Sequence, residues 1–257
     1  MTKGKKQPEA VIADVVASTG AITTGPESPR INTAELPFET EQLRAELARF
    51  LKQKYQPKGW PKAKNLGSVK CGVYAFYDYD GEPIYVGQTK ESLGTRIRRH
   101  LTNQRTDSVA MSVLDPLEVH TVEVWPLPKF QDRAAKNPEA TDYLNSLEYA
   151  VFTHLLAGST FNAVLNEKLP VASSVKVKIG ESLKATVVSA DVSRLRDHPD
   201  LRIARRAMTL AKLAQVISAR KVQRGLRRTL LAQATRLQIL AQRRYDNAAE
   251  ISEKEAD

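Results

Sequence analysis

The sequence has a single cysteine, Cys71, among its 257 residues, so the chain can form neither an internal disulfide nor a metal site built from paired cysteines. It also has no run of 18 apolar residues, which argues against a transmembrane helix. Three lysines among the first six residues are followed by Glu9 and Asp14, which interrupt the apolar core that a secretory signal needs. We therefore expect a cytoplasmic protein without a membrane partner, in which Cys71 is a small apolar filler.

Acidic residues are absent from residues 201–245, within a chain that carries 39 basic and 29 acidic residues and a formal net charge of +10. A basic balance of this size favours a polyanionic partner such as nucleic acid. Leucines at helical spacing predict a basic helical segment over residues 201–257. We expect this segment to contact the DNA backbone; a solvated helix and a dimer helix are the alternatives. The cations selected as DNA contacts are Arg220, Lys221, Arg224, Arg227 and Arg228. A membrane surface is a weaker alternative, because the segment lacks Trp and Phe.

Three other segments have no chemical motif. Residues 1–35 mix Gly, Pro, Ser and Thr with small apolar residues and predict a mobile N-terminal tail. Residues 36–67 contain an amphipathic helical pattern that ends before Pro57, so we expect a helix followed by a linker. Residues 169–200 alternate apolar and polar side chains only weakly, which fits a linker or a weak hairpin.

The central segment, residues 68–168, has the patterns of a small domain that contains both strands and helices. Residues 72–77 and 83–87 are rich in aromatic and β-branched side chains, and the turn-forming pair Asp80-Gly81 lies between them. This pattern predicts an antiparallel hairpin with a five-residue connection.

Further elements follow this hairpin. Ser92 can cap a helix that extends to Leu101, residues 119–125 predict a third strand, and residues 141–157 predict a second helix. The fold class is therefore α/β, or more narrowly α+β: a three-stranded antiparallel sheet flanked by helices, with a basic helical C-terminal segment in addition.

Two tripeptides, Gly72-Val73-Tyr74 and Tyr85-Val86-Gly87, occupy the paired strands of the predicted hairpin. With the residues that follow them, they resemble the GIY-YIG nuclease superfamily over residues 68–168, and most closely its restriction-endonuclease branch. The further matches, in the order and spacing of that family, are Arg96 and His100 on the first helix, Glu148 on the second, and Asn162 beyond it.

The resemblance implies a role for each matched residue. Tyr74 would be the general base or would orient the attacking water, and Tyr85 would position the phosphate or the base. Arg96 would stabilise charge on the scissile phosphate, and His100 would assist proton transfer or phosphate binding. Glu148 would bind one divalent ion, Mg²⁺ with Mn²⁺ as a substitute.

Three positions add detail to this assignment. Asn162 would support the geometry of the site. Some restriction members have a lysine directly after the second tripeptide, but here Gln88 takes that position, and Lys90 is the candidate to replace the lysine. Arg98 and Arg99 lie beside the matched helix residues and are candidate DNA contacts.

Elementary chemistry agrees with these roles. A tyrosine with an ordinary pKa of about 10 can accept a proton only if nearby cations lower that pKa. Arg96 and His100 lie four residues apart and share one face of a helix, so they could supply that field together with Lys90 or the metal.

Three functions are open at this point. The first is restriction-type cleavage of duplex DNA, for which one site per subunit requires either a homodimer on a symmetric target or sequential nicking. The second is a repair or recombination nuclease that recognises DNA structure or damage, and its discriminator is the substrate. The third is a non-catalytic DNA-binding protein on a retained nuclease fold, against which the intact Tyr74, Arg96 and Glu148 argue.

Overall fold

The computed structural model describes residues 38–102, 114–132, 137–166, 168–172, 177–219, 221–222 and 224–256, with side chains to residue 247. The expected N-terminal tail, residues 1–35, and the expected DNA contact Arg220 lie outside the described residues. Within the described part of the chain, each helix is too short or too polar to span a membrane.

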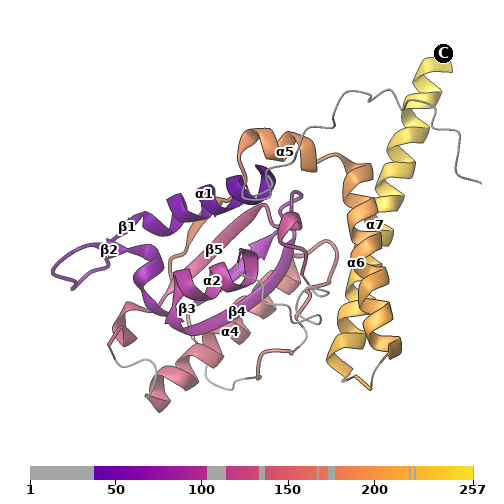
Figure 1. Ribbon diagram of the computed structural model, residues 1–257. Helices are drawn as coiled ribbons and strands as arrows, with labels where there is room; N and C mark the ends of the chain where they lie inside the picture. Colours follow the sequence, from indigo (N-terminus) through magenta and orange to yellow (C-terminus); the bar gives the residue numbers. More distant parts are fainter. Residues whose placement is uncertain are drawn as a thin grey trace, which may run out of the picture. The chain divides into compact units, whose positions relative to one another are not determined.

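The chain is a mixture of helices and strands, and three helices follow one another at its C-terminal end (Figure 1). In order, they are α1 (Phe38–Lys52), β1 (Lys54–Tyr55), β2 (Lys64–Asn65), β3 (Lys70–Tyr77), β4 (Pro83–Ser92), α2 (Leu93–Leu101), β5 (Thr121–Pro126), α4 (Pro138–Gly158), β6 (Leu183–Thr186), α5 (Ala190–Arg196), α6 (Pro199–Ala219) and α7 (Arg224–Ala256).

The main sheet has four strands in the order β4-β3-β5-β6, and all its neighbours are antiparallel. The hairpin of β3 and β4, with its connection at residues 78–82, agrees with the prediction. The prediction of three strands is wrong, because β6 pairs with β5 from Thr121↔Thr186 to Val124↔Leu183. This strand has only four residues, and its side chains are exposed or half-buried, so it lacks the apolar pattern that marks a strand in a sequence.

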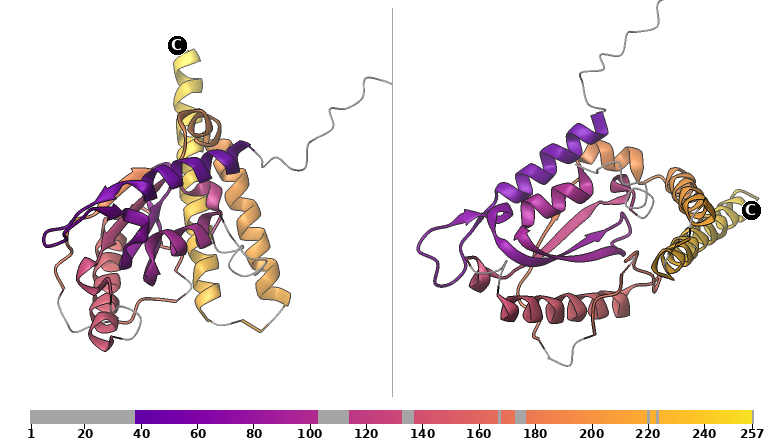
Figure 2. Two further views of the ribbon diagram at one scale, coloured as in Figure 1. Left: turned by 60° about the vertical axis from the view of Figure 1, so that its left-hand side comes forward. Right: turned by 60° about the horizontal axis from the view of Figure 1, so that its bottom comes forward.

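Two apolar layers enclose the sheet. Tyr74 and Phe76 of β3 belong to the buried cluster that includes α1 and α2, whereas Val73 and Ala75 belong to the cluster that includes α4. Figure 2 shows α1 and α2 on one face of the sheet and α4 on the other. Because successive strand residues point to opposite faces, both layers are supplied by the same strand.

Local sequence signals determine where the two flanking helices begin. The Ser92 side chain accepts a hydrogen bond from the Thr95 amide and caps α2, as its position predicts. The Asn137 side chain caps α4 in the same way by accepting from the Glu139 amide. These caps set the helix starts, so that His100 and Glu148 follow at fixed positions on the two helices.

The basic C-terminal segment forms two helices, α6 and α7, that pack side by side (Figure 1). Several of its arginines are directed inward: the side chains of Arg202, Arg206 and Arg236 are only 2–3% exposed. This corrects the expectation that the acid-free run as a whole presents its cations to a partner.

Asp78, at the end of β3, is the centre of this inward network. Its Oδ2 accepts hydrogen bonds from Arg206 Nη2 at 2.8 Å and from Arg236 Nη2 at 2.6 Å. Its Oδ1 accepts from the backbone amides of Asp80 and Glu82 and so closes the β3–β4 turn. One carboxylate therefore joins the β3–β4 hairpin to both C-terminal helices.

Candidate active site

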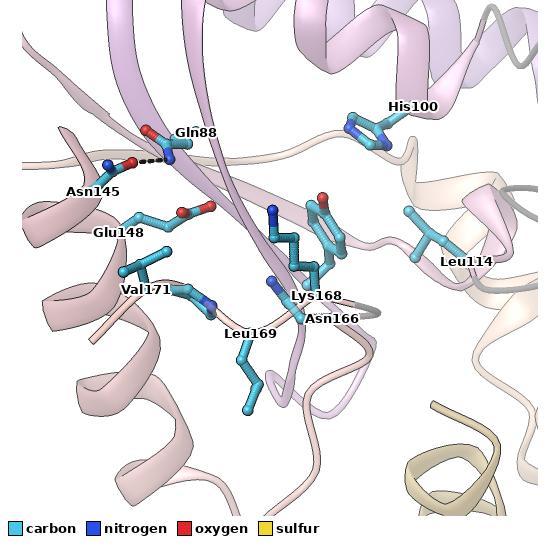
Figure 3. A pocket seen from close by; sticks show the side chains of 11 residues that line it. Gln88, His100, Leu114, Asn145, Glu148, Asn166, Lys168, Leu169 and Val171 are labelled. Carbon is cyan, nitrogen blue, oxygen red and sulfur yellow. Dashed lines mark hydrogen bonds between the residues drawn. The ribbon is translucent and has the colours of Figure 1, made fainter. Parts of the chain in front are cut away.

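A cavity of about 510 Å³ lies at the free edge of the sheet, beside β4. Figure 3 shows its lining side chains, which come from β4, from the end of α2, from α4, from the segment that follows α4 and, at Leu114, from the segment before β5. The residues that line it include Tyr85, Gln88, His100, Glu148, Asn166 and Lys168. Three residues expected from the sequence, Tyr85, His100 and Glu148, therefore meet at one cavity.

Tyr74 lies directly behind this cavity and is fully buried. Its hydroxyl is 3.0 Å from His100 Nε2 and accepts a hydrogen bond from Arg96 Nε at 3.3 Å. Because Arg96 can only donate, the Tyr74 proton is available to a neutral His100. The structure thus joins three of the expected residues by hydrogen bonds.

Gly87 makes room for this arrangement. It is the cross-strand partner of Tyr74, and a Cβ at this position would lie 2.5 Å from the Tyr74 hydroxyl and 2.8 Å from the Tyr85 ring. No real side chain fits in that space, so the glycine of the second tripeptide is needed where the two tyrosines converge.

The expected lowering of the Tyr74 pKa is not found. Burial, with the nearby Tyr85, raises the pKa of Tyr74 well above its ordinary value, and Arg96 opposes this only in part. The physical reason is that the hydroxyl is removed from water, which penalises the charged tyrosinate more than one guanidinium stabilises it. Tyr74 is therefore a neutral phenol in this structure.

His100 is also neutral near pH 7. Burial is the main cause that lowers its pKa to about 4, and the neighbouring charges of Arg96 and Arg99 add to the effect. A neutral imidazole can accept a proton at the nitrogen that faces Tyr74. Tyr74 and His100 therefore form a donor–acceptor pair without a net charge.

Glu148 faces the cavity from α4 as a carboxyl group of unusual proton affinity. Burial raises its pKa to about 7, against the opposing effects of a hydrogen bond from Gln88 and of the charges of Arg96 and Lys168. The described residues give it no salt bridge within 4 Å, and they include no cluster of three or more His, Cys, Asp or Glu side chains that could hold a metal. Any ion here would rest on few protein ligands.

Gln88 supplies a second oxygen beside Glu148. Its side-chain nitrogen donates to Asn145 Oδ1 at 2.7 Å, while its Oε1 is buried and has no hydrogen-bond partner among the described residues. An unpaired buried acceptor is costly unless something binds it. In the sequence, Gln88 is notable only because it replaces the lysine that some members of the family have at this position.

The structure brings Asn166, and not Asn162, to the cavity. Asn162 is exposed in a turn with a φ of 46° and does not line the site. Asn166 is buried, and its side chain bonds both backbone groups of Val86, accepting from the amide at 3.1 Å and donating to the carbonyl at 2.7 Å. The structure therefore places Asn166, and not the expected Asn162, at the cavity, where it holds the outer edge of β4.

The other expected residues lie around the site. Lys90 is two residues beyond Gln88 and donates to Thr141 Oγ1 at 2.7 Å, so it does not line the cavity. Arg98 and Arg99 are exposed on α2, and Arg99 is paired with Glu91 through two bonds of 2.7 Å.

The C-terminal cations expected to contact DNA divide into two kinds. Lys221, Arg224 and Arg227 are exposed, whereas Arg228 donates to the Asn166 carbonyl at 3.0 Å. Arg228 thus contacts a residue that lines the cavity.

Comparison with known proteins agrees with this geometry. Residues 70–133 match the family model of the GIY-YIG catalytic domain, which includes both tripeptides, Arg96 and His100. No curated protein and no solved structure matches the chain. The match indicates a nuclease, a hydrolase that acts on DNA, and it leaves open the branch of the superfamily.

Proposed function

We propose that the chain is a Mg²⁺-dependent endonuclease that cleaves duplex DNA in the manner of a restriction enzyme. The observation that carries the proposal is the convergence of Tyr85, His100 and Glu148, from three separate elements, on one cavity. The hydrogen-bonded Tyr74 behind it adds a proton-transfer group. A protein that only binds DNA would have no use for this combination.

The residues present fit a hard cation such as Mg²⁺. The Glu148 carboxylate and the unpaired Gln88 Oε1 are two oxygen donors at the cavity. Mg²⁺ is commonly held by one or two protein oxygens, with water and substrate phosphate completing its shell. When bound, the ion would lower the pKa of a coordinated water and neutralise charge on the phosphate. Mn²⁺ is the expected substitute.

The chain's own residues would move the proton and hold the phosphate. As the Tyr74 oxygen takes a proton from the attacking water, its own proton passes to His100 Nε2, so no free tyrosinate has to form. Arg96 donates a hydrogen bond to the same oxygen and would stabilise the partial negative charge on it while the two protons move. Tyr85 and Lys168 line the cavity and would orient the phosphate. Asn166 keeps β4, and therefore Tyr85, in place.

Exposed cations outside the cavity would hold the rest of the duplex. Arg98 on α2 and Lys221, Arg224 and Arg227 near the start of α7 are exposed and suit phosphate contacts. Such contacts orient the duplex but do not read its sequence.

The direct test is cleavage of a panel of plasmid and phage DNAs with Mg²⁺, by the parent chain and by Glu148→Ala and Tyr74→Phe. We expect discrete fragments from the parent chain, none from Glu148→Ala, and a rate about 10²- to 10⁴-fold lower for Tyr74→Phe. Glu139→Ala, an exposed acidic position at the start of the same helix, is the matched control and should cleave normally.

Other outcomes would change the proposal in defined ways. Nicking or smearing that depends on Glu148 would replace the restriction role by a nuclease directed at DNA structure or damage. Unchanged activity in Glu148→Ala would remove the catalytic assignment. Tight binding without cleavage of any substrate would favour a non-catalytic DNA-binding protein.

A further inference from the structure

A second acid-free segment lies on the other side of the catalytic strands. Between Glu46 and Asp78 the sequence contains no aspartate or glutamate. Within it, β1 and β2 form a short hairpin that projects beyond the sheet in Figures 1 and 2. The basic residues of the segment are Arg49, Lys52, Lys54, Lys58, Lys62, Lys64 and Lys70.

The lysines of this hairpin are not used for internal ion pairs. Lys58, Lys62 and Lys64 are exposed, and each is without a salt bridge to any carboxylate that the structure describes. The C-terminal acid-free segment is different, because several of its arginines form ion pairs with carboxylates of residues 68–168. Arg202 pairs with Asp80, and Arg206 pairs with Asp78. Uncompensated charge of one sign on an exposed hairpin is suited to a polyanion.

The hairpin forms one wall of a groove with a volume of about 610 Å³. Trp60, Lys62 and Lys64 line the hairpin side, and Lys129 and Gln131 line the opposite side. Aromatic rings support the cations on both sides.

These supporting rings are specific. Lys64 Nζ lies 4.9 Å from the centre of the Trp60 ring, and Lys129 Nζ lies 3.5 Å from that of Tyr143. Asp132 is the one acidic residue among the described residues that line the groove.

The groove is connected to the catalytic cavity through β4. Gln131 accepts a hydrogen bond from the backbone amide of Lys70, and Lys70 pairs with Ser92, the last residue of β4. Gln88, at the cavity, is four residues earlier on the same strand, about 13 Å away at the rise of a β-strand. Lys90 lies between them.

Helix α4 contacts the same path at three points. Its residues Thr141, Tyr143 and Asn145 touch Lys90, Lys129 and Gln88 respectively. The cations Lys90 and Lys129 therefore both lie against α4, on the path from the cavity to the groove.

We propose that the β1–β2 hairpin and its groove bind the phosphodiester backbone of duplex DNA beyond the end of β4, outside the catalytic cavity. The inference rests on the proposed function, since it places the substrate of the same site. Lysines act as flexible point charges, so this contact adds affinity without reading sequence.

The test measures binding separately from cleavage. The parent for this experiment is Glu148→Gln, and its affinity for a fluorescent 30-base-pair duplex is measured by anisotropy over a series of salt concentrations. The hairpin variant adds Lys58→Gln, Lys62→Gln and Lys64→Gln. The charge-matched control adds Lys178→Gln, Lys184→Gln and Arg194→Gln, which are exposed elsewhere. A third variant replaces the same three hairpin lysines by arginine.

We expect the hairpin variant to bind about tenfold or more weakly, and its slope of log K against log salt to fall by about two to three. The control and the arginine variant should remain within about threefold of the parent. If the hairpin variant matches the control, or if the arginine variant loses as much as the glutamine variant, the inference is overturned while the proposed function stands. If the parent binds no duplex, both are overturned.

Discussion

At Glu148, the proposed function and the stability of the fold favour different protonation states: a metal ion needs the carboxylate, whereas burial favours the neutral carboxyl group. Burial raises the pKa of this carboxyl to about 7, so the folded chain binds the proton more tightly than the unfolded chain does. The stabilisation that comes from this tighter proton binding is fully present below the ordinary carboxyl pKa of about 4.3 and is lost as the pH rises through 7. At pH 8 the protein carries a buried carboxylate that only a cation would stabilise.

We therefore predict that Glu148→Gln raises the free energy of unfolding at pH 8 by about 1–3 kcal/mol and has little effect at pH 4.5. Urea denaturation without divalent ions measures this difference. Added Mg²⁺ should stabilise the parent chain and not the variant. Exposed Glu139→Gln is the control and should change stability by less than about 0.5 kcal/mol at either pH. A stability difference independent of pH would show that burial does not raise the pKa of Glu148.

At the scale of the element, the structure separates what local sequence determines from what it does not. The β3–β4 hairpin and the start of α2 are predictable because each depends on adjacent residues: the strand pattern, the Asp80-Gly81 turn and the Ser92 cap. The inward direction of Arg236 is not predictable, because its partner Asp78 is 158 residues away.

The candidate site shows the same limit. Tyr74, Arg96 and His100 are brought together as their spacing on one hairpin and one helix suggests. Two asparagines follow α4 at similar distances, and only pairing with the edge of β4 distinguishes Asn166 from Asn162. Spacing along the chain cannot reveal a contact that depends on the strand edge.

Asp78 is the strongest connection between elements, which gives a second prediction. Asp78→Ala would leave Arg236 buried without its carboxylate, would leave Arg206 with Glu118 alone, and would open the β3–β4 turn. Removing one partner from a buried ion pair typically costs 3–5 kcal/mol, so we expect a loss of about that size in urea denaturation.

Asp80→Ala is the matched comparison. Asp80 pairs with Arg202, but its side chain is 29% exposed. Water can therefore replace part of this contact, and we expect a loss of only about 1 kcal/mol. Equal losses for the two variants would mean that the network around Asp78 contributes no more than the partly exposed Asp80–Arg202 pair.

At the scale of the whole molecule, the two acid-free segments have opposite uses. The C-terminal segment directs Arg202, Arg206 and Arg236 into the catalytic domain, whereas the β1–β2 hairpin keeps its lysines exposed. A net charge of +10 is therefore a poor measure of the surface available to DNA. Position and pairing decide which cations can neutralise phosphates.

The inward network makes the C-terminal helices part of the catalytic fold, and residues 37–257 form one compact unit by their contacts. Leu213 and Ile217 of α6 and Leu226 of α7 belong to the same buried cluster as Tyr74. Separation of the helices would expose this cluster and leave Asp78 unpaired. We therefore predict that the sheet and the C-terminal helices unfold in one cooperative transition.

Two spectroscopic signals can test this directly. Both tryptophans, Trp60 and Trp125, lie in the sheet-containing part, whereas α6 and α7 contribute 21 and 33 residues to the helical signal. Urea curves followed by tryptophan fluorescence and by circular dichroism at 222 nm should therefore have the same midpoint. In Asp78→Ala both midpoints should move together to lower urea. A helical transition that precedes the fluorescence transition would instead show that the C-terminal helices are an independently unfolding segment, and the buried arginines would then have to be regarded as a weak contact.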